Sequence, residues 1–195
     1  MHGTERRKVN TERVWAAYLL MALATLLALP AQSAVWYVNA ASTAASPNGQ
    51  SWATAYPAIQ PGVDAAASGD EVWVAAESYT STTAEVVSLK SGVTLYGGFA
   101  GTETAREQRD WASNITIIDG QQARRCVTAT DATSTVDGFV LQYGKAEHGS
   151  GMHFGTAANC TFLRNTAPEQ YFHGGGMYGG TATNCTFVAN DFLKC

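Results

Sequence analysis

Short runs of apolar residues recur along the chain from residue 35 onward, and turns rich in Gly or small polar residues separate them. β-branched and aromatic residues are frequent in these runs, which favours strands over helices. The expected strands are 35–39, 71–75, 86–89, 93–96, 115–118, 126–128, 139–141 and the two Asn-Cys-Thr-Phe segments at 159–162 and 184–187. The pattern therefore predicts an all-β chain, with one short helix after residue 34.

One unit of the sequence is written twice near the end of the chain. The segment 148–165 returns as 173–190, and 12 of its 18 positions are identical in the second copy. A fixed period of this size is typical of a solenoid, in which each repeat buries its apolar face against the next one. The last third of the chain is therefore expected to form stacked coils.

Similar spacing extends the repeat toward the N-terminus. The points taken as equivalent are Trp73, Leu95, Ile117, Phe139, Cys160 and Cys185, which follow one another at steps of 22, 22, 22, 21 and 25. Coils of this length with Gly-rich corners fit a parallel β-helix of about six coils, about 21–25 residues each, over residues 69–195. A leucine-rich repeat would require a Leu-x-x-Leu-x-Leu pattern, which the sequence lacks.

Alternation within the last two units assigns their faces. Cys160 and Phe162 are expected to point inward, and Thr161 is expected to point outward. Asn165 and Asn190 end equivalent strands, where their side chains are expected to stack and to form hydrogen bonds along the axis.

The N-terminal part is predicted to contain a signal peptide and a cap. Residues 1–34 combine a basic start, an uncharged run and small residues at its end, which is the layout of a secretory signal; a retained membrane anchor is the alternative. Residues 35–68 supply a strand and, within 55–67, a helix that is expected to close the first coil. Pro61-Gly62 is expected to interrupt this helix and to limit its regular part to the residues that follow.

Composition and charge restrict the partners. An apolar fraction of 46% with 14% charged residues argues against a disordered chain. Without residues 1–34 the chain keeps 8 of its 12 basic residues and 14 of its 16 acidic residues, so it is net negative. Because phosphate binding depends on clustered Lys and Arg, nucleic acid is not a predicted partner. No membrane span is predicted after residue 34.

The four cysteines, Cys126, Cys160, Cys185 and Cys195, all lie in the part that is predicted to be exported, where disulfides can form. The sequence leaves three full pairings open. Cys160 and Cys185 hold equivalent places in successive coils, and we expect buried free thiols there in preference to a disulfide. The chain shows no zinc-type spacing of Cys or His residues.

A Gly-rich element and a Phe-x-x-Asn element alternate in the last two units. Gly-Gly-Gly-Met at 174–177 precedes Phe-Val-Ala-Asn at 187–190, and the earlier unit departs from this pattern only in having Ser150 between its glycines. Leu-Tyr-Gly-Gly-Phe at 95–99 and Val-Asp-Gly-Phe at 136–139 add to the pattern upstream. The chain thus resembles exported right-handed parallel β-helix proteins of the pectin-lyase-like fold, and its repeats are similar to those of chlamydial polymorphic outer membrane proteins.

The resemblance implies a secreted or cell-surface protein, associated with the outer membrane and often adhesive, with a separate anchoring segment. The sequence stops soon after Asn190 without a polar capping unit, so the chain is predicted to be a fragment of a larger protein. The predicted function is that of a non-catalytic scaffold or adhesin-like protein that contacts glycans or surface proteins.

Polysaccharide cleavage is the alternative function, because many proteins of the resembled fold are lyases or glycoside hydrolases. Asp119 and Asp137 each precede a Gly near a strand end and are the candidate catalytic carboxyls, although Asp-Gly is also ordinary turn chemistry. His148 and His173 are candidate metal ligands, but two imidazoles without a third ligand make an incomplete site. No cofactor is predicted, and catalytic coils beyond Cys195 are a further form of this alternative.

Overall fold

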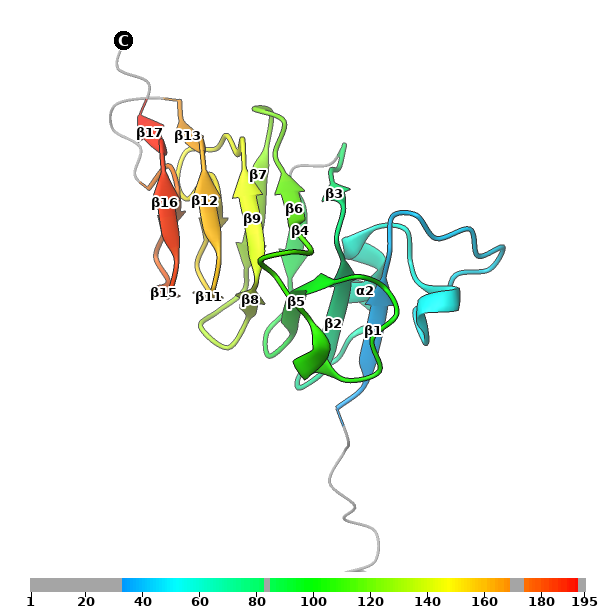
Figure 1. Ribbon diagram of the computed structural model, residues 1–195. Coiled ribbons are helices and arrows are strands. Elements are labelled where there is room, and N and C mark those ends of the chain that lie inside the picture. Colours follow the sequence, from blue (N-terminus) through cyan, green and yellow to red (C-terminus); the bar gives the residue numbers. More distant parts are fainter. Residues whose placement is uncertain (1–32, 83–84, 169–173, 193–195) are drawn as a thin grey trace, which may run out of the picture. The chain divides into compact units, whose positions relative to one another are not determined.

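The computed structural model describes residues 33–82, 85–168 and 174–192 (Figure 1). The chain divides into two units, Met1–Gln32 and Ser33–Cys195, and every described residue belongs to the second unit. The predicted signal peptide therefore lies outside the described residues apart from its last two positions, as do His173 and Cys195.

Almost all regular structure in the described residues consists of parallel β-sheets. The first sheet has the order β1–β2–β5–β8–β11–β15, formed by Val35–Val38, Glu71–Ala75, Thr94–Phe99, Thr135–Asp137, Thr156–Ala158 and Thr181–Thr183. The second has the order β14–β10–β7–β4, formed by Met177–Tyr178, Met152–His153, Arg125–Ala129 and Glu85–Leu89. The third has the order β16–β12–β9–β6–β3, formed by Thr186–Val188, Thr161–Leu163, Phe139–Gln142, Thr116–Asp119 and Ser78–Tyr79. A small sheet pairs β13 (Thr166–Ala167) with β17 (Asp191–Phe192).

Every strand pairing among the described residues is parallel. The prediction of an all-β chain built on parallel strands is therefore confirmed. The chain visits the three larger sheets in rotation: β8 is followed by β9 and β10, and β11 is followed by β12 and, after β13 of the small sheet, by β14.

The repeat found in the sequence is also the register of this stacking. Met152 pairs with Met177, Thr156 with Thr181, and Phe162 with Phe187. The strand residues of the first copy thus lie beside their own counterparts, as expected for a solenoid.

The predicted set of equivalent points is wrong in the middle of the chain. Leu95 pairs with Val136 in the first sheet, whereas Ile117 lies in the third sheet and pairs with Val140. The step from Leu95 to Val136 is almost twice the expected coil length, because the segment 100–115, which contains the 3₁₀ helix η2 (Arg106–Gln108), leaves the stack between β5 and β6. The β2–β5 and β8–β11 pairings on either side of this excursion keep the expected coil length, whereas the β5–β8 pairing across it does not. The β1–β2 pairing also exceeds this length, because the segment with η1 and α2 lies between these strands.

Most of the buried apolar side chains of the three larger sheets form one cluster, whereas Trp73 and Phe99 of the first sheet stack on each other outside it. Cys160 and Phe162 are buried and Thr161 is partly exposed, which confirms the predicted alternation. The Phe162 ring stacks on Phe187, with ring centroids 4.6 Å apart and planes 3° apart. Asn159 is not part of the strand, because its φ of 51° places it in a left-handed turn before β12.

Helix α2 (Ile59–Ala65) follows a short 3₁₀ helix, η1 (Trp52–Thr54). The prediction that Pro61 interrupts this helix is wrong, because Pro61 lies in the first turn, where backbone N–H groups have no acceptor within the helix. Ile59 and Val63 belong to the core cluster, and their helix contacts strands β1 and β2. No helix among the described residues is long and apolar enough to cross a membrane.

Candidate functional site

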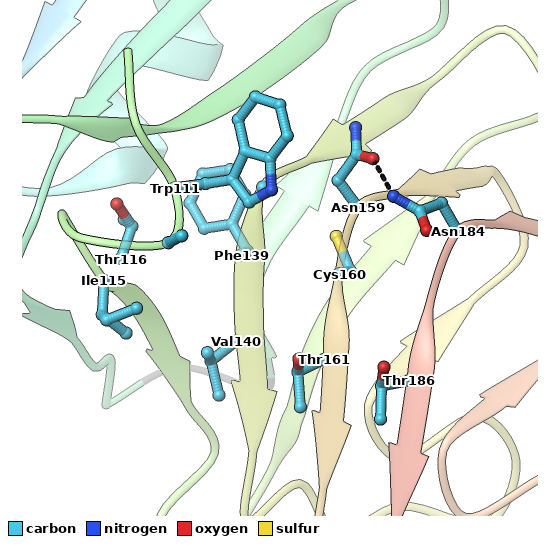
Figure 2. A pocket seen from close by; sticks show the side chains of 12 residues that line it. Trp111, Ile115, Thr116, Phe139, Val140, Asn159, Cys160, Thr161, Asn184 and Thr186 are labelled. Atoms are coloured by element: carbon cyan, nitrogen blue, oxygen red, sulfur yellow. Dashed lines mark hydrogen bonds between the residues drawn. The ribbon is translucent and has the colours of Figure 1, made fainter.

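A hollow of about 350 Å³ opens where the segment 111–116 passes beside the third sheet (Figure 2). Its walls come from this segment, from β9, and from the turns that lead into β12 and β16. The lining residues are Trp111, Ala112, Ile115, Thr116, Gly138, Phe139, Val140, Asn159, Cys160, Thr161, Asn184 and Thr186.

The aromatic wall of the hollow is Trp111, whose side chain is 41% exposed. The backbone of Trp111 passes directly over Gly98, where an added Cβ would lie 2.7 Å from the Trp111 Cα atom. Gly98 also has a φ of +92°, so the close approach and the backbone conformation both require glycine. The indole is thereby held against the first sheet while one side of it stays accessible.

The guanidinium group of Arg109 packs against the aromatic wall. Its guanidinium lies 4.6 Å from the Trp111 ring centroid and 4.8 Å from that of Tyr96. It also donates to the carbonyl oxygens of Gly97 and Asp137, at 3.3 and 3.2 Å. These contacts tie the excursion to two strands of the first sheet.

The polar wall is a row of amides that begins at an ion pair. Arg109 Nη2 lies 3.0 Å from Asp137 Oδ1, and this carboxylate also accepts a 2.9 Å hydrogen bond from Asn159 Nδ2. Asn184 Nδ2 in turn donates to Asn159 Oδ1 at 2.6 Å (Figure 2). We call the Asp137 carboxylate and the two amides that follow it, Asn159 and Asn184, together the amide row. Each donor points toward the ion pair, so the row is polarised in one direction.

The two candidate catalytic carboxyls, Asp119 and Asp137, lie near opposite ends of strand β9. Asp137 precedes β9, whereas Asp119 pairs with Gln142 at the other end of that strand, so the length of β9, about 10 Å, separates their positions. Glycoside hydrolysis uses carboxyls about 5–9.5 Å apart. The Asp119 carboxylate accepts hydrogen bonds from Gln121 N at 2.7 Å and Gln142 Nε2 at 2.9 Å, as in an ordinary turn.

His148 lies in a group of stacked rings on the second sheet. The His148 ring stacks on Tyr178 with centroids 4.9 Å apart, and His153 contacts both Tyr178 and Phe154, at 5.6 and 4.1 Å. Burial lowers the pKa of His153, and the nearby Arg125 charge acts in the same direction. Among the described residues no group of three or more His, Cys, Asp or Glu side chains could hold a metal ion. His173 lies outside the described residues.

Sequence reasoning missed the excursion as part of a site. In the structure Arg106 of this segment pairs with Glu71 at 2.6 Å, and Arg109 pairs with Asp137. A local contact of Arg106 with Glu107, at 3.7 Å, is present as well. The close spacing of Arg109 and Trp111 was the available signal, but the excursion is not repeated, so periodicity could not place it.

Comparison of the chain with models of protein families, with curated proteins and with solved structures found no match. Function must therefore be inferred from the hollow itself. Its combination of an exposed indole, amides and hydroxyl groups decides which ligands fit.

Proposed function

We propose that the protein is a non-catalytic, secreted or cell-surface scaffold with an adhesin-like role, and that the hollow beside Trp111 contacts glycans. In this proposal the sheets belong to a right-handed parallel β-helix of about six coils, associated with the outer membrane, with α2 as its N-terminal cap. The six-stranded first sheet and the rotation of the chain among three sheets support the architecture. The burial of Ile59 and Val63 against the first strands supports the capping role.

The observation that carries the proposal is that the Trp111 indole and the amides of Asn159 and Asn184 line the same hollow. A sugar ring has an apolar C–H face and a rim of hydroxyl groups. The accessible side of the indole suits the C–H face, whereas Asn159, Asn184 and the hydroxyl groups of Thr161 and Thr186 offer partners to the rim (Figure 2). Both kinds of group line one hollow, as recognition of a single ring requires.

Charge favours a neutral glycan over an acidic one. The Asp137 carboxylate, which accepts a hydrogen bond from Asn159 in the wall of the hollow, is neutralised by Arg109. The part after residue 34 has 14 acidic and 8 basic residues, so an acidic polysaccharide would be repelled at long range. We therefore expect the ligand to be an oligomer of neutral hexoses or pentoses.

Polysaccharide lyase or hydrolase activity remains the alternative function. It would place chemistry at Asp119 and Asp137, or in coils beyond Cys195. The hydrogen bonds that engage both carboxylates give it less support than the binding function.

The test is binding of the purified chain to an array of neutral gluco-, manno- and xylo-oligosaccharides, with oligogalacturonate and alginate oligomers as the acidic arm. Titration calorimetry on the best neutral binder should show at least a tenfold loss of affinity in Trp111→Ala, about 1.4 kcal/mol. Phe154→Ala is the matched control, because Phe154 is 42% exposed on a different surface. Equal binding by wild type and Trp111→Ala would contradict the proposal. Unsaturated products from pectin or alginate, lost in Asp137→Asn, would favour the enzyme instead.

A further inference from the structure

Cys160 and Cys185 directly precede the neighbouring strands β12 and β16. The following residues, Thr161 and Thr186, are register partners, and Thr186 N donates to Cys160 O at 2.9 Å. In-register neighbouring strands lie about 4.8 Å apart. This spacing is within the range of about 4.4–6.8 Å over which two Cα atoms can carry a disulfide. Both residues carry free thiols in the structure, as does Cys126.

The two thiols differ in access to solvent. Cys160 is 2% exposed, and its Sγ atom donates to the carbonyl oxygen of Ala158 at 3.1 Å. Cys185 is only partly buried. An external reagent can therefore reach Cys185 more readily than Cys160, which is almost fully shielded from solvent. This is the arrangement of an attacking and a resolving thiol.

The pKa values of the two thiols also differ: that of buried Cys160 is raised, and that of partly exposed Cys185 is lowered. Burial raises the pKa of Cys160 far above its ordinary value, so it stays a protonated donor. The hydrogen bond from Cys160 lowers the pKa of Cys185 to about 6, although partial burial opposes this shift. The lowered pKa favours ionisation of Cys185, whose protonated thiol donates to Thr183 O at 3.3 Å. Cys126 is the internal contrast, because burial raises its pKa to about 12.

We propose that Cys185 and Cys160 form a thiol–disulfide exchange site for low-molecular-weight disulfides such as oxidised glutathione. The Cys185 thiolate attacks one sulfur of the external disulfide, forms a mixed disulfide and expels one thiolate, which takes up a proton. The Cys160 thiol then loses its proton and attacks the Cys185 sulfur, which expels the second thiolate. The two protein thiols lose two electrons in total, and the external disulfide gains them.

This proposal is independent of glycan binding. Its product would be a covalent link between the two copies of the repeat, at the edge of the hollow that Cys160 lines. Loss of the exchange reaction leaves the role of Trp111 untouched, and the reverse also holds.

The sequence makes the test direct, because trypsin separates all four cysteines. Cleavage after Arg125, Lys145, Arg164 and Lys194 places Cys126 in 126–145, Cys160 in 146–164, Cys185 in 165–194 and Cys195 alone. The full chain is titrated with oxidised glutathione and quenched at intervals, and its peptides are analysed by mass spectrometry. The expected result is glutathione on 165–194 first, followed by a linked pair 146–164 with 165–194.

The pH dependence of iodoacetamide labelling at Cys185 gives a second readout. The midpoint should lie near 6 in wild type and move toward the ordinary value of about 8.5 in Cys160→Ala, which removes the donor. Cys160→Ser keeps a hydroxyl donor and should leave the midpoint lower than Cys160→Ala does. In Cys160→Ala the mixed disulfide should also accumulate without a linked peptide.

Three results would overturn the proposal. A wild-type midpoint near the ordinary thiol value would show that Cys185 is not activated. A mixed disulfide that persists with Cys160 present would show that no resolving step occurs. Glutathione on Cys195 or Cys126 in preference to Cys185 would place the reactive thiol elsewhere. The peptide assignment also keeps the test valid if one variant fails to fold.

Discussion

The two copies of the repeat have nearly the same sequence but different surroundings. The first copy lies between β7, β8 and β9 on one side and the second copy on the other. The second copy has a described neighbour on one side only. Phe162 is accordingly fully buried, whereas its counterpart Phe187 is 50% exposed. The repeat therefore sets which residues meet, and the number of neighbouring coils sets how much each contact stabilises the fold.

The largest effect is expected at the stacked phenylalanines. Phe162→Ala should lower the free energy of unfolding by about 4 kcal/mol, because it removes a buried ring from a packed core. Phe187→Ala should cost only about 1 kcal/mol, because half of the ring is already in water. Urea unfolding followed by tryptophan fluorescence measures both variants. Equal losses would show that surroundings do not decide the contribution.

The asparagine pair should show the same contrast with a smaller effect. Asn165 is fully buried and accepts from Gly144 N at 2.7 Å while donating to Leu141 O at 2.8 Å and to Asn190 Oδ1 at 2.9 Å. Asn165→Ala leaves buried groups without partners and should cost about 3 kcal/mol. Asn190→Ala, at a partly exposed position, should cost about 1 kcal/mol. The same unfolding experiment separates them, and a larger loss for Asn190 would contradict this expectation.

The two arginines of the excursion extend the comparison to ion pairs. The side chains of Arg109 and Asp137 are 9% and 14% exposed, whereas Arg106 is 39% exposed. Arg109→Met should lower stability by about 2 kcal/mol, because it leaves the Asp137 carboxylate poorly solvated and unpaired. Arg106→Met should cost less than about 1 kcal/mol. Recovery of stability in Arg109→Met/Asp137→Asn would show that the unpaired Asp137 carboxylate causes the loss. Without recovery, the loss would come from missing packing of Arg109 on Trp111.

The smallest effect concerns pH at the N-terminal end of the first sheet. Burial acts to raise the pKa of Asp70, but hydrogen bonds from Ala67 N, Ala34 N and the Trp36 indole outweigh it and hold the pKa below its ordinary value. The unfolded chain therefore takes up this proton first as the pH falls. The contribution of Asp70 is complete above about pH 5 and is lost as the pH falls through its folded pKa. Melting temperatures between pH 6 and 3 should fall less steeply in Asp70→Asn, and parallel curves would contradict the assignment.

Much of the fold could be predicted from the sequence, and the limits have physical causes. The alternation of Cys160, Thr161 and Phe162 was enough to assign inside and outside, and the equivalence of Asn165 with Asn190 predicted their hydrogen bond. Equal spacing misled the upstream assignment, because a residue count does not tell which of three sheets a run joins. Leu95 and Ile117 are separated by one expected coil length and yet lie in different sheets.

The candidate site was harder to predict, because it depends on contacts between distant, unrepeated segments. The sequence marks Asp137 as a candidate catalytic residue, because its carboxylate precedes Gly138 near a strand end. Its partner Arg109 is 28 residues earlier in the chain, in a segment without periodicity. The asparagines of the amide row were recognised only as parts of Asn-Cys-Thr repeats, and the left-handed turns that aim them at Asp137 are a property of the folded backbone.

The excursion at residues 100–115 also bears on how such a chain can change over time. The strands before and after it keep their parallel registers, so its length is uncoupled from the rest of the stack. Natural variation in ligand preference could accumulate there without disturbing neighbouring coils. For protein engineering, the same segment is an attractive place to graft a foreign recognition loop.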